Sequence, residues 1–427
     1  MNSRIHQTLK RKHISLLCAA ALVLLMPFTR TALPWVLVCW LAALIIEKAY
    51  LENPFRFLPS QSARYAFYTF SGIYLLLLMS LIVSTEINDG IKQLTQSLSL
   101  LIIPIMVLYS SDVLRKNRTL ILRSFIAGVS LAAVLCIFFS FFAYINAGGG
   151  LQVNEINAER FNEYFYYRNF SYFAHPAYFS LFVNISLVFL FFDSGLTNAK
   201  RQIITVKISL GLLHIAAIYF LSSRAGLITL FISLIFLTIF LIKSINKKRY
   251  KIFTFSVLLI LIALSVFNPR IYPKLQQAHQ YFFQANNNKQ EATPSRIAIW
   301  KSAWLAADKN LLTGSGIGTE KYLIGQNYKP EKYLSVNAHN QFLDYTVSAG
   351  IFAGFLLLLQ LLLGLITAVR KEQLAFILFI IYMGINLLFE SMLYRLLGVV
   401  FYSFFFSFFL IMPHSKKQQI KQTPDGN

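Results

Sequence analysis

The sequence is poor in charge, and especially in acidic charge. Only 13% of its 427 residues are charged, with 17 Asp and Glu against 39 Lys and Arg. Apolar residues make up 56% of the chain, which is more apolar surface than a soluble domain can bury. Runs of about 18 or more apolar residues, long enough to cross a bilayer, recur along it. We therefore predict an all-α, polytopic integral membrane protein. The runs are continuous rather than alternating, which excludes a closed β-barrel.

Cysteine and clustered acidic residues are also scarce. The three cysteines, Cys18, Cys39 and Cys136, all lie in apolar runs and lack metal-ligand spacing, so we interpret them as packing residues. The seven histidines are scattered along the chain, and the acidic residues form no Asp-x-Asp or comparable cluster. The sequence therefore predicts no metal site and no cofactor.

The apolar runs predict about twelve transmembrane helices. The first run follows a basic head and resembles a signal peptide, but Pro34 and a second apolar run come directly after it, so we expect a retained span. The expected spans are 14–28, 32–46, 66–84, 96–110, 120–144, 177–193, 204–222, 225–242, 252–268, 346–368, 374–391 and 396–412.

Lys and Arg concentrate in alternate loops, as the positive-inside rule requires if the N-terminus is cytoplasmic. The short loop 85–90, on the opposite side, has none. Both termini are therefore predicted to be cytoplasmic. These loops account for the formal charge of +22 without a basic soluble domain, so we expect no nucleic-acid partner. The cations of the inner loops are Lys48, Arg56, Arg64, Arg115, Lys116, Arg118, Lys200, Arg201, Lys207, Lys243, Lys247, Lys248, Arg249, Lys251, Arg370 and Lys371.

Two longer segments are predicted on the outer side. The expected organisation is helices 1–9 over 1–268 with a smaller outer loop at 146–174, a large outer loop over 269–345, helices 10–12 over 346–412, and a cytoplasmic tail over 413–427. The large loop carries more Lys and Arg than Asp and Glu although it faces outward. Long loops are exempt from the orientation rule. Its basicity therefore indicates an anionic ligand or, alternatively, contact with anionic membrane lipids.

A helix is predicted inside the large loop. Thr293 is a suitable N-cap, with Pro294 at the first helical position. Apolar residues then recur on one face, which predicts an amphipathic helix at the membrane surface; they are Ile297, Trp300, Trp304 and Leu311. The glycine run 313–318 follows. It lacks the strand before it and the Lys-Ser/Thr ending of a phosphate-binding loop, so we interpret it as a helix stop with a flexible turn.

Three arginines stand where electrostatics disfavours them. Arg224 opens the eighth span, Arg296 lies in the first turn of the loop helix, and Arg395 opens the last span. Each puts a cation near the positive end of a helix dipole, at a cost of roughly 0.3–1 kcal/mol when exposed. A helix N-terminus together with a guanidinium forms an anion site. Interface anchoring is the alternative for each, and three on one face favour the anion site.

His339 is the strongest single candidate for chemistry. Asn337 is a natural N-cap, which would place His339 in the first turn of the tenth span. The helix dipole and the nearby arginines disfavour an imidazolium there, so we expect a neutral, proton-accepting ring that suits a general base. A purely structural histidine in a loop is the alternative. Glu390, at the outer end of the eleventh span, is predicted either to pair with Arg395 or to act in catalysis.

Several of these residues together resemble the O-antigen ligase and O-antigen polymerase family. They are Ser223-Arg224-Ala225-Gly226, Ser295-Arg296 with Trp300, His339-Asn340 with Gly350, and Glu390 followed by Arg395. The similarity is strongest from His175 to Arg395. One departure leaves the subfamily open: the glycine after Gly350 is Gly354, whereas ligases often have it one residue earlier, at the position of Ala353.

The resemblance implies an inverting, metal-independent glycosyltransferase of the bacterial inner membrane, with its active site on the periplasmic face. The donor would be a glycan on undecaprenyl pyrophosphate. The acceptor would be a hydroxyl of lipid A–core for a ligase, or a second lipid-linked glycan for a polymerase. His339 and Glu390 would be catalytic. Residues that would bind substrate are Arg224, Arg296, Arg395, Asn340, His175 and Arg168.

Two alternatives from other classes remain. A flippase or other transporter would place its binding groups near the bilayer midplane in two related halves, whereas the unusual charges here are predicted at the outer ends of spans. A non-enzymatic envelope assembly factor would not need a histidine and three outward arginines together.

Overall fold

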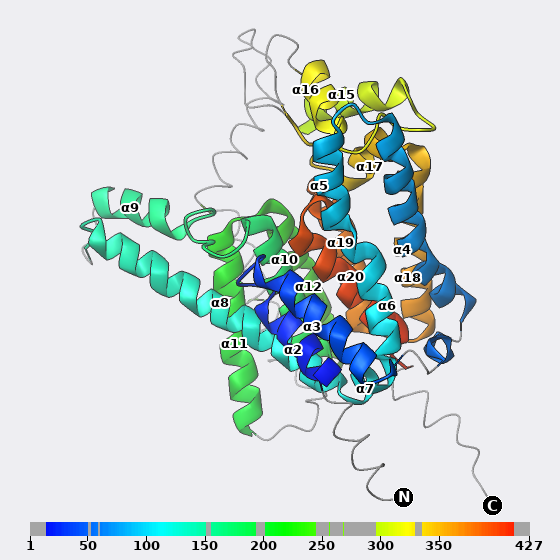
Figure 1. Cartoon of the computed structure of the whole chain (residues 1–427). Coiled ribbons are helices and arrows are strands. Elements are labelled where there is room, and N and C mark those ends of the chain that lie inside the picture. Colours follow the sequence, from blue (N-terminus) through cyan, green and yellow to red (C-terminus); the bar gives the residue numbers. More distant parts are fainter. Residues whose placement is uncertain are drawn as a thin grey trace, which may run out of the picture. The chain divides into compact units, whose positions relative to one another are not determined.

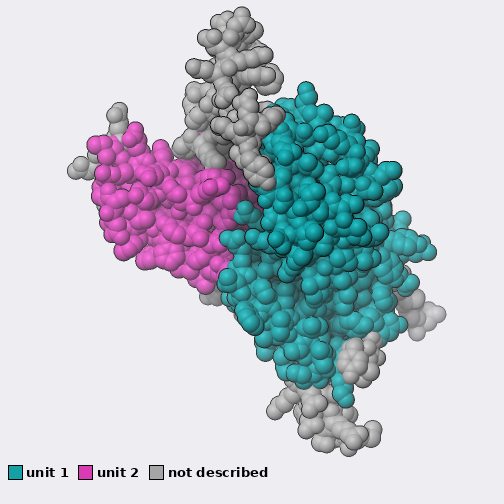
Figure 2. All heavy atoms as spheres, turned by 45° about the horizontal axis from the view of Figure 1, so that its top comes forward, with its two compact units in different colours: residues 1–26, 30–121, 291–427 teal, residues 27–29, 122–290 magenta. Residues whose placement is uncertain are grey.

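The computed structural model describes residues 14–49, 53–58, 60–150, 155–193, 201–244, 256, 268, 296–328 and 335–413. Every regular element in these ranges is helical, which confirms the all-α prediction. The chain divides into two compact units, coloured separately in Figure 2. Unit 1 comprises residues 1–26, 30–121 and 291–427, and unit 2 comprises 27–29 and 122–290.

Eleven of the predicted spans coincide with apolar helices in the described residues. Four are long and apolar enough to cross a membrane: Gln61–Val83, Ile87–Tyr109, Arg118–Asn146 and Ile351–Arg370. The seven shorter ones are Ile14–Leu25, Ala32–Ile46, Pro176–Phe192, Thr205–Leu221, Arg224–Phe236, Leu374–Phe389 and Leu396–Ile411. The predicted span 252–268 lies outside the described residues except for 256 and 268. The total of twelve spans stays a prediction.

Unit 1 is a helical bundle with three short helices gathered at one end (Figure 1). The bundle contains α2 (Ile14–Leu25), α3 (Ala32–Ile46), η2 (Pro54–Phe57), α4 (Gln61–Ser80), η3 (Leu81–Val83), α5 (Ile87–Ser97), α6 (Ser99–Tyr109), α7 (Ser111–Lys116), α18 (Ile351–Arg370), α19 (Leu374–Phe389), η6 (Met392–Tyr394) and α20 (Leu396–Ile411). The short helices are α15 (Arg296–Asp308), α16 (Glu320–Tyr328) and α17 (Gln341–Ala349). We call residues 296–328 and 335–349 the cap.

Aromatic packing and a few polar contacts join the bundle helices. Phe376 of α19 stacks on Phe409 of α20, with ring centroids 5.2 Å apart. On α18, the buried Gln360 accepts a hydrogen bond from the Tyr402 hydroxyl of α20 at 2.7 Å and donates one to the Ala66 carbonyl of α4 at 3.4 Å. Hydrogen bonds of this kind hold helices together in lipid, where apolar side chains gain little by leaving the bilayer.

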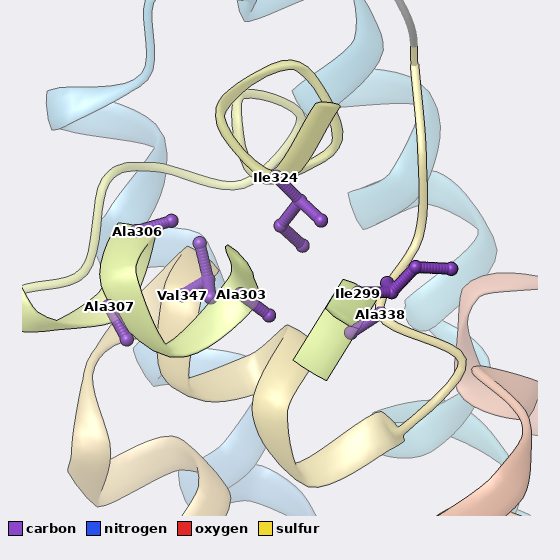
Figure 3. Close-up of a cluster of buried hydrophobic side chains, with 7 residues drawn as sticks. All are labelled: Ile299, Ala303, Ala306, Ala307, Ile324, Ala338 and Val347. Carbon is purple, nitrogen blue, oxygen red and sulfur yellow. The ribbon is translucent and has the colours of Figure 1, made fainter. Parts of the chain in front are cut away.

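A small hydrophobic core holds the cap together (Figure 3). Its members come from α15, α16, α17 and the loop before α17; they are Ile299, Ala303, Ala306, Ala307, Ile324, Ala338 and Val347. Small alanines on α15 let the other elements approach its backbone closely. Ala338 in this core directly precedes His339, so the core fixes the start of the segment that carries the histidine.

The exposed face of α15 carries large apolar side chains. Ile297 is 75% exposed and Trp304 50% exposed, while Trp300 packs on Phe389 with ring centroids 6.3 Å apart. The helix ends at Asp308, so Leu311 is not part of it, contrary to the prediction. The predicted start at Thr293 and Pro294 lies outside the described residues. An apolar face open to the surroundings is what a helix in the membrane interface needs, and that location stays a prediction.

The glycine run after α15 is a buried junction rather than a flexible turn, which corrects the sequence interpretation. Gly314, Gly316 and Gly318 all have φ between +72° and +95°. Ser315 and Gly316 donate backbone hydrogen bonds to the carbonyls of Val347 and Ser348 in α17. A Cβ on Gly316 would lie 2.3 Å from the Ser84 Cα, and one on Gly318 would lie 2.4 Å from the Gly90 nitrogen. The run therefore fastens the cap to the ends of α4 and α5.

Unit 2 contains most of α8 (Arg118–Asn146), and α9 (Glu155–Phe165), α10 (Pro176–Val188), the π-helical turn η4 (Phe189–Asp193), α11 (Arg201–Leu221) and α12 (Arg224–Ser244). The Asn184 side chain of α10 donates to the Gly226 carbonyl of α12 at 3.0 Å. A Cβ on Gly226 would lie 2.6 Å from Ser180, so this glycine permits the close approach of the two helices. The buried His214 hydrogen-bonds Ser130 at 3.0 Å, as expected for a packing histidine.

Replacing Gly318 by alanine should destabilise the protein. The new methyl group would collide with backbone atoms of Gly90 and Glu86 at a φ of +95°, for a cost of roughly 2–4 kcal/mol. Thermal unfolding in detergent, followed by tryptophan fluorescence, should show a Tm lower by several degrees. Gly384→Ala on α19 is the matched control, because a Cβ there meets no heavy atom within 4 Å. Equal losses in both variants would contradict the junction.

Candidate functional site

Three predicted site residues meet in unit 1. The Glu390 carboxylate receives the Arg296 guanidinium on Oε1 at 3.1 Å and His339 Nδ1 on Oε2 at 3.1 Å. Arg296 and His339 are 94 and 51 residues from Glu390 in the sequence. The side chains of Arg296, His339 and Glu390 are 32%, 43% and 18% exposed, so the group is partly exposed. We call Arg296, Glu390 and His339 the triad.

The first two turns of α15 place Arg296 beside Glu390. Arg296 is the first residue of the helix, and Trp300 lies one turn later on the same side. Trp300 stacks on the Phe389 ring, and the Arg296 guanidinium carbon lies 5.8 Å from the centroid of the same ring. Phe389 directly precedes Glu390, so Arg296 and Trp300 both pack at the C-terminal end of α19. The Arg296 cation sits beside the carboxylate, which offsets the unfavourable helix dipole.

The backbone around His339 is unusual. Its φ is +50°, in the left-handed region that a histidine seldom occupies. The N-cap of α17 is Asn340, whose Oδ1 accepts from the nitrogens of Phe342 and Leu343 at 3.0 and 3.2 Å. The prediction that Asn337 caps this helix is therefore wrong. His339 precedes the short helix α17 instead of lying in the first turn of a span, because Gly350, with φ +83°, separates α17 from α18.

Glu390 is the C-cap residue of α19 and has extended backbone angles. The alternative that it pairs with Arg395 is wrong, since its ion pairs in the described part of the chain are with Arg296 and His339. The turn η6 separates the two residues, and Arg395 is the exposed N-cap residue of α20. Arg395 thus opens the last apolar helix, as predicted, but it does not take part in the triad.

Asp344 of α17 is a residue that the sequence analysis missed. Its fully buried carboxylate accepts from the Ala338 nitrogen on Oδ1 at 2.9 Å and from the Ser391 hydroxyl on Oδ2. Ala338 directly precedes His339, and Ser391 directly follows Glu390. One turn earlier, Gln341 Oε1 accepts from the Leu393 nitrogen at 2.6 Å. The first turn of α17 therefore holds the segments on both sides of the His339–Glu390 contact.

A second buried carboxylate, Glu320, was also missed. It begins α16 and accepts from the Gln93 amide of α5 at 2.8 Å and from the Gly318 nitrogen at 2.6 Å. Burial raises the pKa of Glu320 above its ordinary value, while these hydrogen bonds act in the opposite direction. Its contacts tie the cap to α5, so Glu320 supports the glycine junction.

Three predicted binding residues lie in unit 2. Arg224 is the exposed first residue of α12, as predicted. His175 is the N-cap residue of α10, where its Nδ1 accepts from the Ala177 nitrogen at 3.4 Å and its ring meets Tyr167 edge-on. Arg168 is exposed in the turn between α9 and α10. His175 therefore shapes the start of a helix, and the binding roles of the three residues stay predictions.

No group of three or more His, Cys, Asp or Glu side chains that could hold a metal ion occurs among the described residues. The triad instead offers acid–base chemistry. An ionised Glu390 can only accept hydrogen bonds, so His339 Nδ1 carries the proton of their contact. In the neutral ring with its proton on Nδ1, Nε2 is an acceptor that can remove a proton from a hydroxyl group. The carboxylate then stabilises the imidazolium that forms, while Arg296 orients the carboxylate.

Comparison with known proteins agrees with the resemblance. The O-antigen ligase family model matches residues 209–358 of the chain. The segment includes Arg224, Arg296, His339 and Asn340, while Glu390 and Arg395 lie beyond it. No curated protein matches the chain.

The pH dependence of stability should report on Asp344. Burial raises the pKa of its carboxyl from 3.8 to about 7; Glu320 adds to this shift, and the Ser391 and Ala338 hydrogen bonds and His339 oppose it. The folded protein therefore holds a proton that the unfolded chain has lost. The stabilisation from this group is full below pH 3.8 and disappears as the pH rises through about 7.

Asp344→Asn should therefore show a smaller fall in Tm between about pH 5 and about pH 8 than the wild type. The pKa of Glu320 is also raised by burial, so Glu320 should contribute to the fall that remains. Asp308→Asn is the control, because Asp308 is exposed and its replacement should leave the wild-type profile. An unchanged profile in Asp344→Asn would show that this carboxyl does not titrate there.

Proposed function

We propose that this chain, which matches the O-antigen ligase family model over residues 209–358, is an inverting glycosyltransferase. It would move a polysaccharide from undecaprenyl pyrophosphate to a sugar hydroxyl of lipid A–core, at the periplasmic face of the bacterial inner membrane, in lipopolysaccharide biosynthesis. The observation that carries the proposal is the triad, in which His339 is held by Glu390 and Glu390 by Arg296. A transfer of this kind needs a base for the acceptor hydroxyl and cations for the leaving diphosphate.

The triad supplies the base. The acceptor hydroxyl gives its proton to His339 Nε2 while its oxygen forms a bond to the anomeric carbon of the donor. The bond from that carbon to the pyrophosphate oxygen breaks, and the electron pair leaves with the pyrophosphate. Glu390 stabilises the positive charge on His339 throughout, through the 3.1 Å contact to Nδ1. A general base typically contributes about 10²–10⁴-fold to such a step.

Arginines would hold the pyrophosphate. Arg296 uses one terminal nitrogen for Glu390, and its fork has further N–H groups that could meet phosphate oxygens. The same role for Arg224, which belongs to unit 2, is proposed from the sequence, as a cation at the start of a helix. Arg395, Arg168, His175 and Asn340 complete the proposed binding set. Charge that develops on the leaving group is the main quantity such a site stabilises.

A polymerase that extends lipid-linked repeats is the second candidate, because the same chemistry serves either acceptor and the family match covers the domain that both would use. Transport is less well supported. The triad joins residues at the ends of helices α15 and α19 with the loop before α17, whereas transporters bind near the middle of broken helices.

Removal of the base should abolish transfer. With purified lipid-linked donor and acceptor, His339→Ala should lower kcat by about 10²–10⁴-fold while its Tm stays near that of the wild type. Asn337→Ala is the matched control: Asn337 lies in the same loop, is partly exposed and does not cap α17. Wild-type turnover in His339→Ala would remove the histidine from this role.

A deletion strain should separate the two acceptors. If the chain is a ligase, polymer should accumulate on the carrier lipid while lipid A–core stays bare, because assembly proceeds but attachment fails. If it is a polymerase, lipid A–core should carry a single repeat. Mass analysis of extracted lipopolysaccharide and carrier lipid makes the distinction. Normal lipopolysaccharide in the deletion strain would contradict both.

A further inference from the structure

We propose that Asp344 is a positioning residue, which sets the distance between His339 and Glu390 by holding both of their chain segments. The proposal rests on the proposed function, since it concerns the same base. Asp344 acts on the pair through their neighbours in the chain, since it accepts hydrogen bonds from the Ala338 nitrogen and the Ser391 hydroxyl.

The segment with His339 needs such a restraint. A left-handed φ of +50° is unfavourable for a histidine, so the loop would relax if its ends were released. Asn340 fixes the following side by capping α17. On the preceding side, the Ala338 methyl lies in the cap core and its N–H is bonded to Asp344. Asp344 therefore holds the backbone that presents the imidazole.

The segment with Glu390 needs it as well. Regular helix ends at Phe389, and the chain continues in extended form through Glu390 before the short turn η6. The Ser391 hydroxyl donates to Asp344 Oδ2, and the Leu393 nitrogen donates to Gln341 of the same helical turn. The two oxygens of one buried carboxylate thus join the two halves of the catalytic pair.

Four variants separate positioning from general stability. Ser391→Ala removes the hydrogen bond between Asp344 and the segment with Glu390. Asp344→Ala removes that bond and the one to Ala338. Asp344→Asn keeps an oxygen for the Ala338 nitrogen and an N–H for the Ser391 oxygen, and Ser391→Thr keeps the hydroxyl. Both variants should therefore be much faster than the alanine variants at the same positions. Ser302→Ala is the matched control, because that buried hydroxyl donates to the Ala298 carbonyl of its own helix.

The experiment is a steady-state transfer assay with the full-length protein in detergent. Ser391→Ala should lower kcat about tenfold and Asp344→Ala about a hundredfold, with donor KM within about twofold, because misplaced catalytic groups slow the reaction without weakening binding. Asp344→Asn, Ser391→Thr and Ser302→Ala should stay within about threefold of the wild-type kcat. If Asp344→Ala does not fold, Ser391→Ala carries the test alone.

A double-mutant cycle gives the decisive readout. In a His339→Ala background, Ser391→Ala should lower the residual rate less than about twofold, because there is no imidazole left to position. A tenfold loss in both backgrounds, or a wild-type rate in folded Ser391→Ala, would overturn the proposal. The outcomes are distinguishable: a wild-type rate in His339→Ala overturns the base itself, whereas an inactive His339→Ala with fully active Ser391→Ala overturns only the role of Asp344.

Discussion

One carboxylate shared between a guanidinium and an imidazole organises the cap end of unit 1. Glu390 meets Arg296 on one oxygen and His339 on the other, so helices α15 and α19 and the loop before α17 converge on it. A partly buried carboxylate between a guanidinium and an imidazole is stable only when both partners are held in place. The remaining features of the cap, including its alanine core, its capped helix and its glycine junction, supply that restraint.

The restraint is layered. The alanine-rich core closes α15 on α16 and α17, and the left-handed glycines bring the cap against the ends of α4 and α5. Two buried carboxylates then replace water as acceptors for backbone and amide N–H groups, Glu320 at the junction and Asp344 beside the triad. Buried polar groups of this kind are costly unless they are fully bonded. Here each carboxylate accepts hydrogen bonds on both of its oxygens, which offsets the cost of burying it.

Much of this architecture could be predicted from the sequence, because continuous apolar runs have one stable solution in lipid. The position of Arg224 at the start of a helix was predicted correctly from local signals. Pairings were harder. Five residues of separation suggested a Glu390–Arg395 pair, but the turn η6 intervenes. Two asparagines flank His339, and only the three-dimensional path of the loop decides that Asn340 is the cap. Asp344 gave no signal, since its importance comes from burial by distant segments.

The span of the family match has a consequence for how this protein can be taken apart. The matched segment ends at residue 358, but the partner of its histidine and the serine beside that partner come later in the chain, and the residues that receive its glycines come earlier. The matched segment therefore cannot be exchanged on its own between related proteins. If it were exchanged for the same segment of a relative, the new histidine would face a Glu390 and a Ser391 to which it is not matched. The matched segment, the later residues Glu390 and Ser391, and the earlier residues Ser84 and Gly90 would have to be exchanged together.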